Sequence, residues 1–330
     1  MTETTSGTPL RVGIIGTGGI SRAHAPGWVE AGAEIHCFSL EGAEAFAEAY
    51  GATVHDSPES LMGAVDVVDI CTPTAVHAEQ VHAALDAGLN VVCEKPLALT
   101  VEEAEGILEH ARTAGRTVLP AHVVRYFPQY QAARRAVLAG RIGTPAVLRY
   151  ERTGAMPKQP WFADESVSGG IIMDQMIHDI DQALWIAGPV ERVYAQQSIS
   201  SDSDAVRTAH VVLTHHSGVI THCRGLWGPA GTAFRYTFSL AGDGGRLEYD
   251  SAKETGIEFD AVAAGRRSSG GGFLPDVSTM RSPYTVEIED FIRALHGEGE
   301  ADVTCEDGVE AVRIARAALE ALTTGRRITC

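Results

Sequence analysis

The chain has 330 residues, of which 45% are hydrophobic and 21% charged, a composition that can form a large core and suggests about two globular domains. Its formal net charge of −17, without any stripe of Lys and Arg, argues against nucleic acid or an anionic membrane as a partner. No apolar run approaches the ~20 residues of a membrane span and the opening MTETTSGTPL does not resemble a signal peptide, so we expect a cytoplasmic protein.

The first third of the chain alternates short β-branched runs with Ala- and Glu-rich helical patterns, the order that builds a parallel sheet. The expected strands are Val12–Ile15, Glu34–Phe38, Thr53–His55, Val67–Cys71, Asn90–Cys93 and Thr117–Leu119. Helices are expected over Glu41–Tyr50, Ala75–Ala87 and Val101–Ala114, followed by C-terminal caps at Gly51, Gly88 and Gly115.

The first strand ends in a glycine turn, Gly16-x-Gly18-Gly19-Ile20-Ser21, that opens a helix. In a dinucleotide-binding fold one glycine permits the tight turn, one lets the backbone approach the pyrophosphate, and a small third residue lets helix and strand pack closely. Ser21 is small enough for the third position. The same sequence could be a purely structural turn, but its place at the start of a βαβ run favours a phosphate cradle at the helix N-terminus.

The end of the second strand, HCFSLEG, bears on which dinucleotide binds. An acidic residue at this point contacts the ribose hydroxyls of NAD, whereas a basic one suits the phosphate of NADP. Ser39 and Glu41 occupy the loop, without an Arg or Lys beside them. NAD or NADP is therefore the expected cofactor, with NAD favoured because Glu41 would repel a phosphate.

Glu94-Lys95-Pro96 follows the fifth long strand at the edge of the sheet where ligands of open α/β sheets bind. A lysine there could simply be solvated. The proline after it, however, makes Lys95 a rigidly aimed group, which is typical of a working site.

Near Ala121 the pattern changes to long strands with short turns, as expected of a mostly antiparallel sheet. After a helix over Gln129–Ala139, strands are expected over Ala146–Arg152, Val190–Ser198, Ala209–His216, Val219–Leu226, Ala233–Ala241 and Arg246–Asp250. Ala264–Ser282 is a flexible loop by composition, and helices over Thr285–Leu295 and Glu306–Thr323 end the chain. The six cysteines form no Cys-x-x-Cys pair, so we expect buried thiols, with Cys330 a free terminal one, and neither a zinc knuckle nor a disulfide framework.

SGGIIMDQMIHDIDQALWIAG, Ser168 to Gly188, starts with two glycines and continues as a helix. Asp174, His178 and Asp181 are spaced i, i+4 and i+7, which places them on one helix face. That face could be merely wet, or Asp174 and His178 could hold a metal, although further ligands do not follow. We favour a carboxylate that holds a polyhydroxylated substrate while the imidazole moves a proton.

Taken together, these stretches resemble one family over nearly the whole chain. The segments similar to the Gfo/Idh/MocA oxidoreductases are GIIGTGGISRAH, AFAEAYG, VDVVDICTPTAVHAEQVHAALDAGLNVVCEKPLALT, HVVRYFPQY, WFADESVSGGIIMDQMIHDIDQALWIAG and EDGVEAVRIARAALEALTTGRRI. The resemblance implies an α/β fold with an N-terminal Rossmann dinucleotide-binding domain, residues 1–122. A substrate-binding and oligomerisation α/β domain, residues 123–330, would be built on a large, mostly antiparallel open sheet. The helix at about 306–323 is a candidate to pack back on the first domain.

The resemblance also implies site residues. The family's catalytic lysine, aspartate and histidine correspond to Lys95, Asp174 and His178, and its Lys–Pro bond is typically cis, so Lys95–Pro96 is a cis candidate. Cofactor contacts are implied for Gly16, Gly18, Gly19, Ile20, Ser39, Glu41, Thr72, Pro73, His77, Glu94 and Lys95. Substrate contacts are implied for Lys95, Arg125, Trp161 with Phe162, Asp174 and His178, and Arg152 is a further candidate to shape the substrate pocket.

The implied activity is NAD(P)-dependent hydride transfer to or from a secondary alcohol or ketone of a sugar, polyol or similar small molecule. The open sheet implies a homodimer or homotetramer. The alternative is a nicotinamide-binding sensor or scaffold subunit without turnover, which would have no reason to keep Lys95, Asp174 and His178 together.

Overall fold

The structure is a computed structural model that describes residues 9–200, 206–253, 256–261, 272–273 and 281–330. It forms two compact units. The first comprises residues up to Ala98, Glu102–Val123 and Arg281–Gly308, and the second comprises Leu99–Val101, Val124–Met280 and Val309–Cys330. Residues 281–308, expected in the second domain, instead belong to the first unit.

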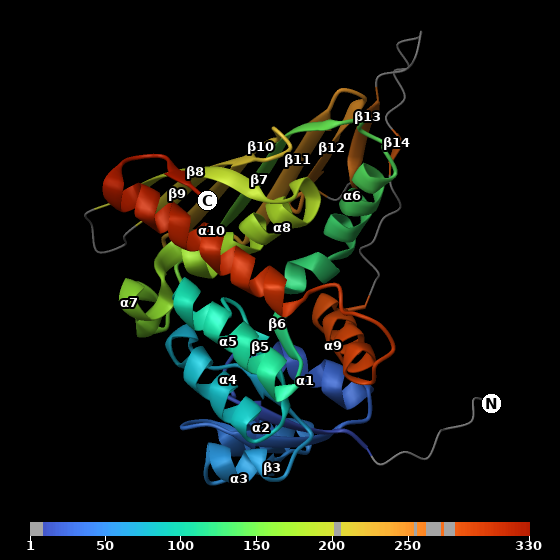
Figure 1. Cartoon of the computed structure of the whole chain (residues 1–330), viewed down its shortest axis with the longest axis vertical. Coiled ribbons are helices and arrows are strands. Elements are labelled where there is room, and N and C mark those ends of the chain that lie inside the picture. Colours follow the sequence, from blue (N-terminus) through green and yellow to red (C-terminus); the bar gives the residue numbers. More distant parts are fainter. Residues whose placement is uncertain (1–8, 201–205, 254–255, 262–271, 274–280) are drawn as a thin grey trace, which may run out of the picture. The chain divides into compact units, whose positions relative to one another are not determined.

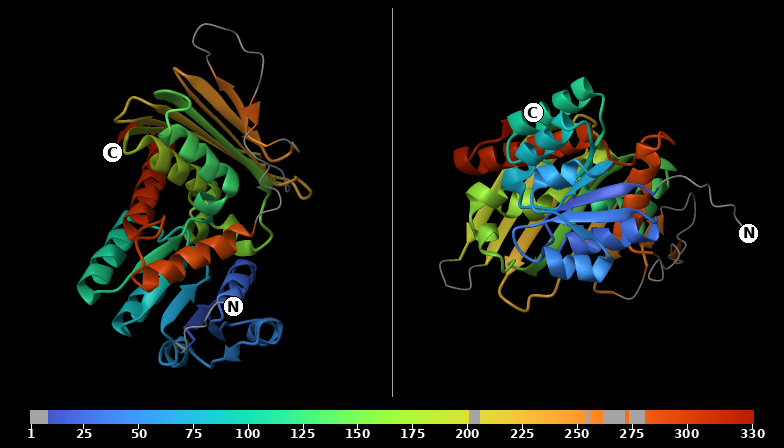
Figure 2. Two further views of the ribbon diagram at one scale, coloured as in Figure 1. Left: turned by 90° about the vertical axis from the view of Figure 1, so that its right-hand side faces the viewer. Right: turned by 90° about the horizontal axis from the view of Figure 1, so that it is seen from below.

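The first unit contains a six-stranded parallel sheet in the order β3-β2-β1-β4-β5-β6, the order of a Rossmann fold. Its strands are β1 Arg11–Ile15, β2 Glu34–Phe38, β3 Thr53–Val54, β4 Val67–Ile70, β5 Asn90–Glu94 and β6 Val118–Ala121. All residues of β4 and β6 are buried, as expected of strands covered on both faces. The predicted parallel sheet is therefore confirmed (Figure 2, right).

Helices connect these strands: α1 Ser21–Glu30, α2 Ala43–Tyr50, α3 Pro58–Met62, α4 His77–Asp86 and α5 Val101–Ala114, with a 3₁₀ turn, η1 Thr74–Val76, before α4. Helix α2 starts two residues later than predicted because Gly42 has a positive φ of 78° and ends the turn after β2. Helix α1 contains Pro26, which has no N–H to donate to the Arg22 carbonyl. The Tyr50 hydroxyl donates to that carbonyl instead, at 3.3 Å.

Helix α9, Pro283–Leu295, explains why residues 281–308 join the first unit. It packs on α1 at Gly27, where an added Cβ would lie 2.9 Å from Ile288 Cβ. The close approach of the two helices thus depends on the missing side chain of Gly27. Of the last helix, α10 Cys305–Thr324, only the first turn through Gly308 belongs to this unit, and the remainder belongs to the second.

The second unit contains a nine-stranded sheet in the order β14-β13-β12-β11-β7-β10-β9-β8-β15. Its strands are β7 Pro145–Ala155, β8 Val190–Ile199, β9 Arg207–His215, β10 Ile220–Gly228, β11 Arg235–Gly242, β12 Gly245–Asp250, β13 Glu258–Ala261, β14 Gly272–Phe273 and β15 Ile328–Thr329. All neighbours are antiparallel except β7 and β10. The predicted mostly antiparallel sheet is confirmed, whereas most of the predicted loop 264–282 lies outside the described residues.

One face of this sheet is covered by α6, Pro128–Leu138, and α8, Ile177–Ala187 (Figures 1 and 2). Tyr130 of α6 packs on Tyr150 and Phe238 of the sheet, with ring centroids 6.4 Å and 5.1 Å away. In the part of the chain that the structure describes, no helix lies over the opposite face (Figure 2). Five cysteines are buried, as predicted, and Cys330 is exposed. No helix among the described residues is long and apolar enough to cross a membrane.

Candidate active site

The glycine turn after β1 is fixed by contacts that only glycine allows. Gly16 has φ +91°, and its N–H donates to the Phe38 carbonyl at 2.9 Å. A Cβ on Gly16 would lie 2.8 Å from the backbone oxygen of Cys71, at the end of β4. The chain therefore passes close to the neighbouring strand before α1 begins, as the first glycine of a dinucleotide turn requires.

The rest of the turn leaves room for a ligand. A Cβ added at Gly18 or Gly19 would meet no atom within 4 Å. Helix α1 follows, and its N-cap residue Ile20 provides no side-chain hydrogen bond to the first amides. The buried Ser21 hydroxyl donates to the Gly18 carbonyl at 2.9 Å, which closes the turn against the helix. An open glycine backbone beside uncapped amides fits the pyrophosphate of a dinucleotide.

The loop after β2 lies next to this turn. Thr17 Oγ1 donates to the Glu41 carbonyl at 3.0 Å, which holds the backbone of the loop. The Ser39 side chain is half-buried and that of Glu41 is exposed. The loop that carries Ser39 and Glu41 therefore lies beside the glycine turn, as their predicted contact with the adenosine ribose requires.

Two side chains fix the backbone around Lys95. Glu94, the last residue of β5, accepts a hydrogen bond from the Lys95 N–H at Oε2, 2.9 Å away. On the other side, His77 Nδ1 lies 2.8 Å from the Pro96 carbonyl oxygen and His77 Nε2 lies 2.8 Å from that of Thr72. The Lys95–Pro96 bond is cis, which confirms the prediction. The Lys95 side chain is half-buried.

His77 was expected to line the cofactor site, and its ring is 1% exposed. Burial lowers its pKa, although both ring nitrogens face carbonyl oxygens, which favour the protonated form. The structure therefore gives His77 the task of joining the ends of β4 and β5. Thr72 donates to Gln80 at 2.6 Å, and Pro73 is exposed at the start of η1.

In the second unit, Asp174 lies in a π-helical turn, η4 Ile172–Met176, directly before α8. Such turns often occur at functional sites. Gly169, at φ +71°, precedes it, and a Cβ there would lie 2.4 Å from Met173 Cβ. From Gly169 to Ala183 every residue is buried except Asp174 and His178, which are half-buried. The helix thus presents these two polar side chains from an otherwise buried surface.

Asp181 does not belong to this polar pair, contrary to the single face expected from its spacing. It is 1% exposed and holds the guanidinium of Arg125, with Nη2 to Oδ1 at 2.6 Å and Nε to Oδ2 at 2.9 Å. Trp185 lies beside the guanidinium, its ring centroid 5.3 Å from Cζ. Arg125, predicted near the substrate, is therefore a buried ion-pair partner, and its predicted substrate contact stays untested.

A second buried pair joins Arg152 to Asp179, with Nη2 to Oδ1 at 2.8 Å. Burial alone would lower the pKa of Arg152, but the facing Asp179 and Tyr130 outweigh it and raise that pKa. Asp179 is a residue that sequence reasoning missed, although a charged side chain next to apolar Ile177 and Ile180 signals such a partner. Trp161 and Phe162 are both half-buried, and their rings stack with centroids 3.7 Å apart.

The structure also brings together buried polar residues of the first unit that the sequence analysis did not single out. His24 of α1 lies between Asp69 of β4, 3.0 Å from Nδ1, and Glu94, 3.2 Å from Nε2. Trp28 Nε1 donates to Asp69 at 2.8 Å. A charged residue within the apolar strand sequence VVDI was the available signal.

Three residues in this region carry potential metal ligands. Ligand atoms of His24, Asp69 and Cys71 lie within 4.8 Å of one another, the one such group among the described residues. Burial raises the pKa of the Cys71 thiol, which disfavours the thiolate that a metal needs. Hydrogen bonds from Trp28 and His24 already use the Asp69 oxygens. The cluster is best described as a hydrogen-bonded network.

Comparisons with known proteins agree with this architecture. A family model described as "Oxidoreductase family, NAD-binding Rossmann fold" matches residues 10–122, and one described as "GFO/IDH/MocA C-terminal domain" matches residues 130–248. The chain is 31% identical over 274 residues to myo-inositol 2-dehydrogenase of Thermotoga maritima, which covers 80% of this chain and 79% of that protein.

Two further proteins resemble nearly the whole chain. The 1,5-anhydro-D-fructose reductase of Ensifer adhaerens is 30% identical over 335 residues, covering 96% of this chain and 97% of the relative. A solved structure of levoglucosan dehydrogenase in complex with NADH and L-sorbose superposes with a TM-score of 0.86 over 97% of this chain and 98% of that one. At 21% identity, the latter likeness shows the fold alone.

We predict that Asp181→Asn destabilises the protein by about 3–5 kcal/mol, because it leaves the buried Arg125 charge without its carboxylate. The Arg125→Met, Asp181→Leu double variant should regain most of that loss. Urea unfolding followed by tryptophan fluorescence measures both effects. Unchanged stability of Asp181→Asn together with impaired substrate affinity would show instead that Arg125 serves the substrate.

Proposed function

The chain belongs to the Gfo/Idh/MocA oxidoreductase family and is an NAD(P)-dependent dehydrogenase or reductase acting on CH–OH groups, and we propose that its substrate is a sugar, a polyol or a similar polyhydroxylated molecule. The names of the two similar enzymes support this class, since one acts on an inositol and the other on an anhydro sugar. The observation that carries the proposal is that Asp174 and His178 are half-buried while every other residue from Gly169 to Ala183 is buried. A sensor without turnover would not need that pair.

We assign the catalytic roles to Lys95, Asp174 and His178. When bound, the nicotinamide supplies the hydride donor or acceptor at its C4. His178 takes the hydroxyl proton when an alcohol is oxidised and returns it when a ketone is reduced. Lys95 polarises the reacting oxygen, and Asp174 orients His178 or a neighbouring hydroxyl. Trp161 provides an aromatic surface for the substrate.

The dinucleotide site is assigned to the first unit. The open backbone at Gly18 and Gly19 and the uncapped amides after Ile20 suit the pyrophosphate. Thr72, Pro73 and the Glu94–Lys95 turn stand at the ends of β4 and β5, the strand edge where such ligands bind. Exposed Glu41 favours NAD over NADP, because its carboxylate would repel the additional phosphate.

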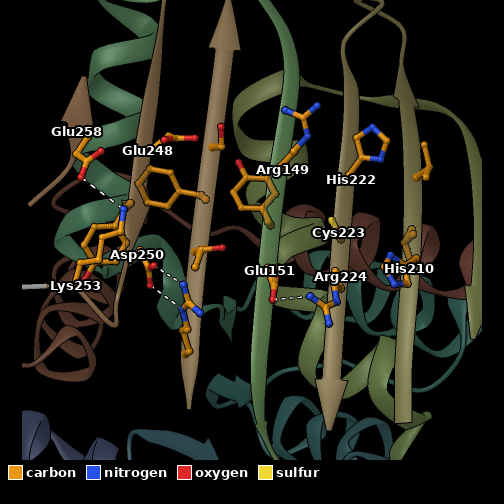
Figure 3. A pocket seen from close by; sticks show the side chains of 18 of the residues that line it. Arg149, Glu151, His210, His222, Cys223, Arg224, Glu248, Asp250, Lys253 and Glu258 are labelled. Atoms are coloured by element: carbon orange, nitrogen blue, oxygen red, sulfur yellow. Dashed lines mark hydrogen bonds and ion pairs between the residues drawn. The ribbon is translucent and has the colours of Figure 1, made fainter. Parts of the chain in front are cut away.

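We further propose that the open face of the nine-stranded sheet packs against a second copy of the chain. The face contains a pocket of about 390 Å³ that is lined by both positively and negatively charged side chains (Figure 3). Arg224 pairs with Glu151 at 2.8 Å, and Arg235 donates to Asp250. Interspersed positive and negative groups can meet their opposites on an identical surface, as a twofold interface requires.

We predict that Lys95→Ala lowers kcat by about 10²–10⁴-fold while cofactor affinity stays within a few-fold, because the lysine acts on the reacting oxygen. Reduced-nicotinamide absorbance with a panel of cyclitols, aldoses and keto sugars measures turnover, and calorimetry measures NAD binding. His178→Ala should lose the same signal. Lys95→Arg, which keeps the charge but not the shape, is the matched variant, and its kcat should lie between those of the wild type and Lys95→Ala. Lost cofactor binding with unchanged kcat would contradict the assigned role.

For cofactor choice, we predict that the protein prefers NAD. Glu41→Ala should lower the ratio of kcat/KM with NAD to kcat/KM with NADP by about tenfold, which corresponds to about 1.4 kcal/mol of repulsion between Glu41 and the additional phosphate. Ratios of kcat/KM for the two cofactors provide the measurement. Glu44→Ala removes the same charge three residues later, in the first turn of α2, and should have a smaller effect. A ratio that Glu41→Ala leaves unchanged would rule out the charge as its cause.

For assembly, we predict a dimer or tetramer in solution that Arg224→Glu weakens at least about tenfold, since the variant places two like charges together with Glu151. Light scattering coupled to size exclusion, over a dilution series, gives the mass. Arg316→Glu, an exposed position on α10, is the charge-matched control. A monomeric wild type would refute the interface.

A further inference from the structure

His24 connects three elements of the first unit. It lies on α1, one turn after Ser21 and the glycine turn, and its ring is fully buried. Nδ1 lies 3.0 Å from Asp69 on β4, and Nε2 lies 3.2 Å from Glu94 on β5. One imidazole therefore links the helix of the dinucleotide turn to both strands whose ends carry proposed site residues.

The geometry defines the protonation state of His24. Ionised carboxylates only accept hydrogen bonds, so both ring nitrogens must donate and the ring is an imidazolium. Trp28 Nε1 also donates to Asp69, at 2.8 Å. Burial alone would lower the pKa of His24, but Asp69 and Cys71 outweigh it and raise that pKa well above its ordinary value.

Helix α9 supplies the remaining neighbours. Its Tyr284 ring lies 6.0 Å from the His24 ring, and its Glu287 is fully buried. Neither Glu287 oxygen has a hydrogen-bond partner among the described residues. Burial raises the pKa of Glu287 well above its ordinary value, which favours the neutral form of this acid. Helix α9 thus adds a third buried carboxyl group beside Asp69 and Glu94.

The Glu94 carboxylate connects His24 to the backbone of Lys95. Its Oε1 faces His24, and its Oε2 accepts the Lys95 N–H at 2.9 Å. If Glu94 lost its counter-charge it would take up a proton in its buried position, because a lone carboxylate there is costly. A protonated Glu94 is a weaker acceptor for the Lys95 amide.

We propose that His24 is a positioning residue for the reaction: its imidazolium keeps Glu94 ionised and oriented, and Glu94 fixes the backbone that aims Lys95. This role rests on the proposed catalytic function of Lys95. It assigns to His24 no contact with substrate or cofactor.

The first test is independent of turnover. In the full-length protein with NAD, labelled with ¹⁵N at histidine, NMR should show protons on both ring nitrogens of His24 from about pH 6 to pH 9. The signals are assigned by their loss in His24→Gln. A His24 ring with one unprotonated nitrogen at pH 7 would overturn the proposal.

The second test is the pH profile of kcat in the wild type and three variants. His24→Gln should lower kcat by about 10–100-fold at pH 6, the cost of a small misplacement, and should recover as rising pH ionises Glu94. The KM for the substrate should change little. The His24→Gln, Glu94→Gln double variant has no carboxylate to titrate, so this recovery should vanish. Glu287→Gln, the matched buried control, should keep the wild-type profile because the Glu287 oxygens make no hydrogen bond to His24 or Glu94.

A wild-type kcat in His24→Gln at pH 6, or a loss that is equal at every pH, would overturn the positioning role. Amide hydrogen exchange of the peptide around Lys95 separates this failure from failure of the proposed function. Faster exchange in His24→Gln than in Glu287→Gln supports the role even without turnover on any sugar. Equal exchange in both variants contradicts it.

Discussion

A charged imidazole between two buried carboxylates is the interaction on which the first unit depends. His24 meets Asp69 and Glu94 in a buried position, where a charged group is costly unless an opposite charge lies beside it. Removing His24 leaves two buried carboxylates without a counter-charge, which costs more than the intact network contributes. The benefit is orientation, since the helix after the glycine turn and the end of β5 are held by one ring.

The turn at Lys95 illustrates how two buried histidines divide a task. His24 acts on this turn indirectly, through the Glu94 side chain, whereas His77 contacts the Pro96 and Thr72 carbonyls directly. In the second unit two Arg–Asp pairs have the corresponding effect. They bury Arg125 and Arg152 with Asp181 and Asp179, and Asp174 and His178 are left as the half-exposed polar groups of their helix.

Much of this could be predicted from the sequence. Both sheets, the glycine turn and the cis bond after Lys95 follow from periodicity, glycine placement and family resemblance. The residue ranges of most strands were predicted well because hydrophobic alternation is a local property of the sequence. Arg125 and Asp181 are 56 residues apart, and His24 and Glu94 are 70 apart, so only the fold reveals that they meet. Nor does spacing distinguish Asp181 from Asp174, because the π-turn shifts which residues share a face.

The position of α9 has a consequence for how the chain reaches its native state. Gly27 and the cluster around His24 are completed by Thr285, Ile288 and Glu287, more than 250 residues later in the sequence. After the ribosome has synthesised the residues of the six-stranded sheet, the face of α1 that packs on α9 remains uncovered until nearly the whole chain has emerged. Such distant contacts close late and slowly. The nucleotide-binding half therefore cannot mature first, although it is encoded first.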